Sequence, residues 1–265
     1  MGINFPNISP NLVDFGFIVI RWYALAYIGG ILLGWWYAKK LIVKYPEFLN
    51  KGLEPKFIDD YVTYAVLGII LGGRAGYVFF YNLPYYIDNP LEAFKVWEGG
   101  MSFHGGLIGA VVAGLLFSRR RKLPFLAVAD STAVTVPIGL GLGRIGNFIN
   151  AELLGRPSNV PWAMIFPTGG PVPRHPSQLY EAAGEGLVLF ILLWTLRQRP
   201  FQDGTMLVFF MLFYGIIRFF LEFFREPDPH IGFLFGLFTM GQVLCLTMIA
   251  GSGLLYLCLR QVASM

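Results

Sequence analysis

Seven apolar segments, each close to the length that crosses a lipid bilayer, constrain this chain more than any other feature of its sequence. A helix needs about 20 mostly apolar residues to span the hydrocarbon core. Charged residues make up only 14% of the chain, whereas a soluble domain typically carries about 25%. We therefore predict an all-α polytopic membrane protein with about seven transmembrane helices. The predicted spans are residues 15–38, 58–81, 101–117, 124–148, 177–196, 205–224 and 234–259.

Basic residues are concentrated in the connections that follow spans one, three, five and seven. They are Lys39, Lys40, Lys44, Lys51, Lys56, residues 119–122, Arg197, Arg199 and Arg260. Because Lys and Arg are enriched in cytoplasmic loops, we predict that the C-terminus is cytoplasmic and the N-terminus lies outside. Residues 149–176 would then form a small extracytoplasmic segment between spans four and five. The sequence shows no repeat or linker, so residues 1–265 are predicted to form a single membrane domain.

Several function classes lack support in the sequence. The net charge of +4 comes from short clusters rather than a continuous basic face, so no nucleic-acid partner is expected. The pattern Gly141-x-Gly143-x-x-Gly146 resembles a dinucleotide fingerprint, but it lies in a membrane-length apolar run without the required strand. No His, Cys and Glu spacing fits a metal site. We predict no metal and no cofactor.

Span six carries ionisable residues along one helix face. Residues at offsets of four, eight and eleven from the first lie within about 80° of one another on a helix, and they are Tyr214, Arg218, Glu222 and Arg225. Such residues are costly at membrane depth and usually face a bundle interior or a wet cavity. The face is therefore predicted to point inward. An Arg218–Glu222 ion pair that merely joins helices is the alternative.

The end of span four is rich in glycine and in polar residues. Its members are Gly139, Gly141, Gly143, Arg144, Gly146 and Asn147, followed by Asn150, Glu152 and Gly155. Glycines at this density let helices approach closely, or let the backbone unwind toward a ligand.

Two further features place ionisable residues in or beside a span. His104 is flanked by glycines at the start of span three, where it is either a structural residue or a proton-transfer group. Glu181 and Glu185 share a face of span five, and their role is left open.

Residues 143–155, Gly-Arg-Ile-Gly-Asn-Phe-Ile-Asn-Ala-Glu-Leu-Leu-Gly, resemble the signature of bacterial prolipoprotein diacylglyceryl transferases. Residues 21–23, 71–77, 99–106, 174–181 and 218–225 are also similar to that family, so the resemblance covers nearly the whole chain. It implies a plasma (inner) membrane enzyme that performs the first step of bacterial lipoprotein maturation. Such an enzyme transfers the diacylglyceryl group of phosphatidylglycerol to the lipobox cysteine of a prolipoprotein, forming a thioether and releasing glycerol phosphate.

The resemblance also implies partners and site residues. The partners would be phosphatidylglycerol, the lipobox peptide and the lipid bilayer, with the active site toward the extracytoplasmic side. Catalysis would involve Tyr23, His104, Arg144 and Arg218. Substrate binding would involve Arg144, Asn147, Glu152, Gly155, Tyr214, Arg218, Glu222 and Arg225. Arginines suit this chemistry, because a planar guanidinium binds phosphate oxygens with two parallel hydrogen bonds.

Two other classes compete with an enzyme. In a transporter for an anionic solute the arginines would line a permeation path, but the inner halves of spans one, three, five and seven carry almost no charge. A lipid-binding or scaffold protein is the third class, and it leaves a histidine and two arginines without a use.

Overall fold

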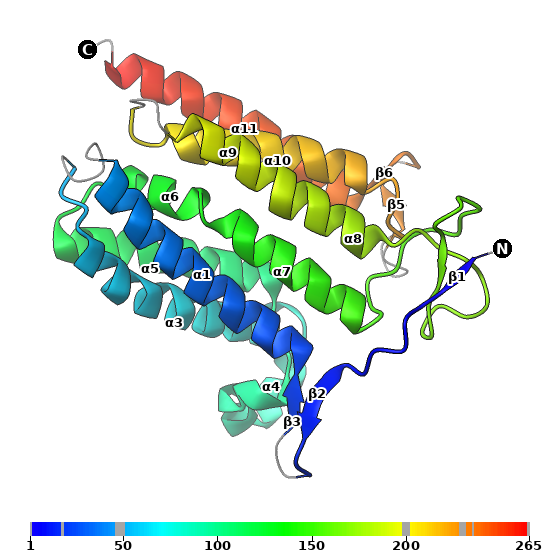
Figure 1. Cartoon of the computed structure of the whole chain (residues 1–265). Helices are drawn as coiled ribbons and strands as arrows, with labels where there is room; N and C mark the ends of the chain where they lie inside the picture. Colours follow the sequence, from blue (N-terminus) through cyan, green and yellow to red (C-terminus); the bar gives the residue numbers. More distant parts are fainter. Residues whose placement is uncertain are drawn as a thin grey trace. The chain divides into compact units, whose positions relative to one another are not determined.

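The structure is a computed structural model that describes residues 2–16, 19–45, 51–197, 202–227, 232–234 and 236–263, and Figure 1 shows its path. The predicted cytoplasmic Arg199 lies outside the described residues. Contacts within the chain define two compact units. One unit contains Met1–Tyr37 and Asp130–Met265, and the other contains Ala38–Ala129. Helix α1, Trp22–Lys44, begins in the first unit and ends in the second.

The unit Ala38–Ala129 is built on α3, Pro55–Phe80, and α5, Phe103–Arg121. Glycines on both helices bring their backbones into contact. A Cβ atom on Gly109 would lie 2.0 Å from the carbonyl oxygen of Gly68, and one on Gly105 would lie 2.3 Å from that of Gly72. Close approach through small residues is typical of membrane helices, which cannot rely on the hydrophobic effect between them.

The segment between α3 and α5 contains the short helices α4, η1 and η2, which are Leu83–Asp88, Pro90–Phe94 and Val96–Glu98. The buried Arg74 of α3 holds this segment through its backbone. Its guanidinium donates to the carbonyl oxygens of Ala93 at 2.8 Å, Glu92 at 2.6 Å and Gly99 at 2.6 Å. The side chain therefore fixes the chain that leads into α5.

The other unit contains most of the remaining helices. They are α7, Val136–Ile149; α8, Ser177–Glu181; η3, Ala182–Val188; α9, Leu189–Leu196; α10, Thr205–Leu221; and α11, Met240–Ala263. Helix α10 packs along α11, and α7 packs against η3 (Figure 1). Helix α6, Phe125–Ala133, meets α7 at a bend of 43°, and Pro137 lies in the first turn of α7. Proline disrupts a helix interior, which fits a bend within the predicted span 124–148.

Within the described residues, three two-stranded sheets accompany the helices. Strand β1, Ile3–Asn4, pairs in parallel with β4, Met164–Ile165. Strand β2, Asn11–Asp14, pairs with β3, Val19–Arg21, and β5, Phe233–Leu234, pairs with β6, Phe238–Thr239; both pairs are antiparallel.

Two predicted span boundaries are wrong because of these hairpins. The first helix begins at Trp22 rather than 15, and the last begins at Met240 rather than 234. Apolar strand residues next to a helix raise the local hydropathy as helical residues do, so hydropathy alone does not separate them.

Three of the described helices are long and apolar enough to cross a membrane, namely Pro55–Phe80, Ser177–Leu196 and Met240–Gln261. Helices α6 and α7 make a fourth if they form one bent span, and Thr205–Leu221 is apolar but shorter. The mostly helical, apolar chain is therefore consistent with a membrane protein. Every predicted span contains a described helix, and the total of seven crossings stays a prediction.

Candidate active site

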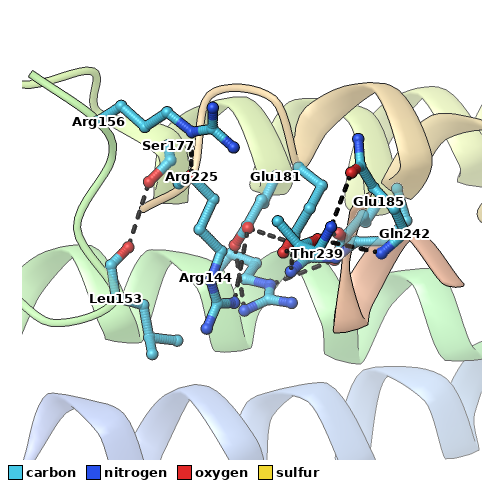
Figure 2. A network of polar contacts seen from close by, with 11 residues as sticks. Arg144, Leu153, Arg156, Ser177, Glu181, Glu185, Arg225, Thr239 and Gln242 are labelled. Carbon is cyan, nitrogen blue, oxygen red and sulfur yellow. Dashed lines mark hydrogen bonds and ion pairs between the residues drawn. The ribbon is translucent and has the colours of Figure 1, made fainter. Parts of the chain in front are cut away.

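Six ionisable side chains of the unit that contains α7 and α10 form one network, which we call the charged cluster (Figure 2). Its members are Arg144, Arg218, Arg225, Glu181, Glu185 and Glu222. They come from α7, from the continuous helical stretch α8–η3 and from the end of α10, so segments distant in sequence meet at one place.

Close contact between α7 and η3 delivers Arg144 to the cluster. A Cβ atom on Gly186 would lie 2.6 Å from the Cα of Gly141, so the two backbones touch there. Arg144 follows Gly141 by about one turn. Its Nη1 lies 3.1 Å from Oε2 of Glu181, and its Nε lies 3.2 Å from Oε2 of Glu185. Gly141 therefore acts in helix packing, one of the two roles predicted for the glycines of span four.

The two glutamates are held on a helical stretch of unusual geometry. Residues Ala182–Val188 form a π-helix, in which Glu185 lies, directly after Glu181 at the end of α8. π-Helical turns are rare in proteins, and those that occur are often found at functional sites. Both carboxylates are buried, with 1% and 0% of the side chain exposed. Burial of a carboxylate is costly unless it is paired, so these residues depend on the arginines around them.

Arg218 links Glu181 and Glu185 to the third glutamate of the cluster, Glu222. Its Nη1 pairs with Oε1 of Glu181 and lies 3.1 Å from Oε1 of Glu185. Its Nη2 lies 2.7 Å from Oε2 of Glu222, which follows it by four residues and caps the end of α10. The ion pair that the sequence offered as a structural alternative is thus present, but it is one part of a larger network.

Arg225 lies farther from the carboxylates, with its Nη1 3.9 Å from Oε1 of Glu181. Glu181 is therefore in contact with all three arginines of the cluster. Tyr214, one turn before Arg218, interacts electrostatically with Arg144, Arg218 and Glu185. Tyr214 and Arg218 lie on α10 as the predicted face requires, but the helix ends at Leu221, so Glu222 and Arg225 reach the cluster from the turn that follows it.

The cluster has a buried side and a partly exposed side. Its three arginines balance its three glutamates in formal charge. The arginine side chains retain 17%, 10% and 14% exposure, for Arg144, Arg218 and Arg225 in turn. The Nη2 group of Arg144 makes no hydrogen bond to any residue in the described part of the chain. N–H donors therefore remain available on the accessible side, where an anion can reach them.

A tight turn after α7 places Asn147 against Glu152. The Asn147 amide donates to Oε1 of Glu152 at 2.7 Å, and the buried Gln178 side chain donates to the Glu152 carbonyl at 2.6 Å. The chain reverses here through left-handed residues, Ala151 and Leu153. Tyr23 of α1 interacts with both Asn147 and Glu152. Tyr23, Asn147 and Glu152 are thus brought together, as a group with its own contacts.

Gly155 lies against two other backbone segments, one at His175 and one at Phe224 and Arg225. It pairs with Arg225 in an antiparallel bridge. A Cβ atom at this position would lie 2.2 Å from the His175 carbonyl oxygen and 2.9 Å from that of Phe224. Next to it, Arg156 donates from Nε to the Arg225 carbonyl at 2.8 Å (Figure 2). Gly155 therefore helps to set the position of Arg225 through the backbone.

His104 lies in the other compact unit, in the first turn of α5. The helix is capped by Ser102, whose hydroxyl accepts the N–H of Gly105 at 3.2 Å. His104 is exposed, and its ring lies edge-on to that of Phe103 with the centroids 5.6 Å apart. The other nine predicted site residues belong to the unit with the charged cluster, and joint action of His104 with them stays a prediction.

Sequence reasoning did not assign a function to Glu181, Glu185, Thr239 or Gln242. The two glutamates gave a signal, because ionisable residues four apart in an apolar span share a helix face. Thr239 gave none, since it lies in a mostly apolar stretch. Among the described residues no group of three or more His, Cys, Asp or Glu is arranged to hold a metal ion.

Comparisons with known proteins agree on one family. The family model for prolipoprotein diacylglyceryl transferase matches residues 10–258. Phosphatidylglycerol–prolipoprotein diacylglyceryl transferase from Methylocella silvestris is 53% identical over 252 residues, covering 94% of this chain and 92% of the relative. The enzyme of that name from Nitrobacter hamburgensis is 52% identical over 266 residues (97% and 89% covered), and that from Nitratidesulfovibrio vulgaris strain DP4 is 50% identical over 248 residues (93% and 93%).

Proposed function

Because the chain belongs to the prolipoprotein diacylglyceryl transferase family, we propose that it transfers the diacylglyceryl group of phosphatidylglycerol to the lipobox cysteine of a prolipoprotein. The cysteine sulfur forms a bond to the terminal glyceryl carbon of the lipid, and the bond from that carbon to the phosphate oxygen breaks. The electron pair stays on glycerol phosphate, and the thiol proton passes to a base. The observation that carries this proposal is the charged cluster, with two guanidinium groups on the same pair of carboxylates.

The proposed task of Arg144 and Arg218 is to bind the lipid phosphate. Their convergence on Glu181 and Glu185 fixes both guanidinium groups before a ligand arrives. Preorganised donors stabilise charge that develops in the transition state, because they need not reorient when the bond breaks. Here the charge develops on the departing phosphate. Tyr214, Glu222 and Arg225 would support the same site.

Replacement by lysine tests this clamp, because lysine keeps the charge and loses the planar fork. We expect Arg144→Lys and Arg218→Lys each to lower kcat/KM for phosphatidylglycerol by about 10²-fold, a typical cost of removing one donor to a developing charge. Arg260→Lys, at the end of α11, is the matched control and should behave as wild type. Equal turnover by all three variants at equal expression would refute the proposal that Arg144 and Arg218 bind the lipid phosphate.

The activity itself is tested with purified protein, phosphatidylglycerol vesicles and a lipobox peptide. Mass spectrometry should show the peptide with a diacylglyceryl thioether on its cysteine, together with free glycerol phosphate. A peptide with serine in place of the cysteine controls for acyl transfer to other groups. No thioether product with correctly inserted protein would refute the proposed reaction.

The proposed base for the thiol is His104. An ordinary thiol, with a pKa of about 8.5, is only partly ionised at neutral pH, so a positioned base accelerates the reaction. The His104 residue is exposed, so its ring is accessible to a substrate. His104→Gln retains a hydrogen-bond donor but cannot accept the proton near pH 7.

We expect His104→Gln to be severely impaired, with partial recovery as the pH approaches the thiol pKa. Near-normal activity of the folded variant at pH 7 would shift the role to Glu152 or Tyr23, which both interact with Asn147 in the other unit.

We also propose seven spans in the plasma membrane, with both compact units acting as one membrane domain of residues 1–265. The N-terminus and residues 149–176 would face outward and the C-terminus inward. A single cysteine at Ser158, in a variant without Cys245 and Cys258, tests this orientation in intact cells. Labelling by an impermeant reagent supports it. Labelling that requires permeabilised membranes would reverse the orientation.

A further inference from the structure

Helix α11 begins with a reciprocal pair of hydrogen bonds. The Thr239 hydroxyl accepts the backbone N–H of Gln242 at 3.2 Å, and the Gln242 side-chain oxygen accepts the backbone N–H of Thr239 at 3.0 Å (Figure 2). This is a capping box, which satisfies two donors that a helix start leaves free. Both side chains are buried, with exposures of 3% for Thr239 and 1% for Gln242.

The same hydroxyl also reaches the charged cluster. Thr239 Oγ1 lies 3.0 Å from Oε1 of Glu222, and it donates this hydrogen bond because an ionised carboxylate only accepts. A cap alone requires an acceptor and leaves the hydroxyl proton free. Thr239 therefore uses its lone pair for α11 and its proton for Glu222.

The backbone of α11 confines the Glu222 carboxylate from another direction. A Cβ atom on Gly241 would lie 2.7 Å from Oε1 and 3.2 Å from Oε2 of Glu222, so the carboxylate rests against the first turn of the helix. Its other oxygen pairs with Nη2 of Arg218 at 2.7 Å. Glu222 is thus held between a hydroxyl, a helix start and a guanidinium.

We propose that Thr239 is a positioning residue for Arg218, acting through Glu222. This inference rests on the proposed function, in which Arg218 binds the lipid phosphate. The Thr239 hydroxyl fixes one carboxylate oxygen, so the other oxygen stays in ion-pair contact with Nη2 and limits where the guanidinium can lie. Nη1 then remains on Glu181 and Glu185. Without the hydroxyl, Glu222 can rotate and Arg218 can turn with it.

Two substitutions separate this role from capping. Thr239→Ser keeps both the acceptor and the donor. Thr239→Gly loses the donor, while glycine is well tolerated at a helix cap. Thr247 lies on the same helix and donates its hydroxyl proton to the Leu244 carbonyl, with 2.8 Å between the two oxygens. It makes no contact with the charged cluster in the described residues, so Thr247→Ala is the matched control.

We expect Thr239→Gly to lower kcat/KM for phosphatidylglycerol about tenfold, since hydrogen bonds to charged groups are among the stronger ones. KM for the lipobox peptide and the melting temperature should stay near wild type. Thr239→Ser and Thr247→Ala should retain wild-type kinetics. In a folded Glu222→Ala background, Thr239→Gly should cause no further loss, because the coupling partner is gone.

The outcomes discriminate between the two proposals. Wild-type kinetics of Thr239→Gly in an active protein would overturn the positioning role and leave the proposed function intact. An equal loss for Thr239→Gly with and without Glu222, or a fall in melting temperature that accounts for the loss, would also overturn it. Absence of transfer by the wild-type protein would overturn the proposed function and this inference together.

Discussion

Replacing Gly155 by alanine is expected to disrupt the crossing of backbone segments that places Arg225. The added Cβ would meet two backbone oxygens, at 2.2 Å for His175 and 2.9 Å for Phe224. Backbone atoms cannot rotate away as the end of a side chain can. The clash is therefore relieved only by separating the segments.

The cost follows from the contacts that separation would weaken. Overpacking of this kind typically costs about 1–3 kcal/mol. The flanking hydrogen bonds are Arg156 N–H to Phe224 O at 2.9 Å and Glu226 N–H to Leu154 O at 3.1 Å. Each contributes about 1 kcal/mol net. We therefore expect Gly155→Ala to lower the free energy of unfolding by about 3–5 kcal/mol, and to displace Arg225 from Glu181.

The assay is thermal unfolding in detergent together with transfer activity. A loss of this size lowers the melting temperature by about 10 °C in a chain of this length. Gly253→Ala is the control, because a Cβ there meets no atom within 4 Å, and it should unfold at or slightly above the wild-type temperature. A Gly155→Ala protein that melts and turns over like wild type would refute the steric argument. Normal melting with lost activity would instead indicate direct contact between Gly155 and a substrate.

Three further perturbations test other parts of the structure. Asp130 accepts the N–H groups of Gly204 at 2.8 Å and Leu207 at 2.9 Å at the start of α10, so Asp130→Ala should cost about 1–2 kcal/mol in chemical unfolding; an unchanged midpoint would contradict this. A lysine at position 74 cannot reach carbonyls on several sides at once, so Arg74→Lys should make residues 89–100 more sensitive to limited proteolysis without changing α3. Equal cleavage of this segment in the variant and the wild type would show that Arg74 does not hold it. Burial lowers the pKa of His175 below its ordinary value of 6.5, so its contribution to stability is complete above about pH 6.5 and is lost as the pH falls through the lowered pKa. His175→Asn should therefore lose less stability than wild type between pH 7.5 and 5.5. If the melting temperatures of both proteins fall equally with pH, His175 is not the source of the pH dependence.

The sequence predicted the helices well where apolar length alone decides them. It placed helix starts wrongly at residues 15 and 234, because hairpins of apolar residues precede α1 and α11. It also predicted that Tyr214 and Arg218 share a helix face, since helical periodicity relates residues within one element, but it extended that helix past Leu221 to Arg225. The sequence did not predict which residues of other elements these side chains contact. The contacts of Arg218 with Glu181 and Glu185 join positions 37 and 33 residues apart, and no local pattern specifies such a pairing.

The pairing changes how the arginines are expected to bind an anion. From sequence, Arg144 and Arg218 are two positively charged, planar groups that are expected to bind a phosphate, with no partner that orients them. In the structure Glu181, Glu185 and Glu222 balance the charge of the cluster, so net attraction is small and the direction of each N–H group becomes decisive. A phosphodiester carries one negative charge and would bind to the accessible edges of guanidinium groups whose other edges the glutamates hold. Geometry rather than charge is then the property that substitution must preserve. This is why lysine, equal in charge, is expected to fail at both arginines, and why a neutral hydroxyl on Thr239 can influence a reaction in which it touches no substrate.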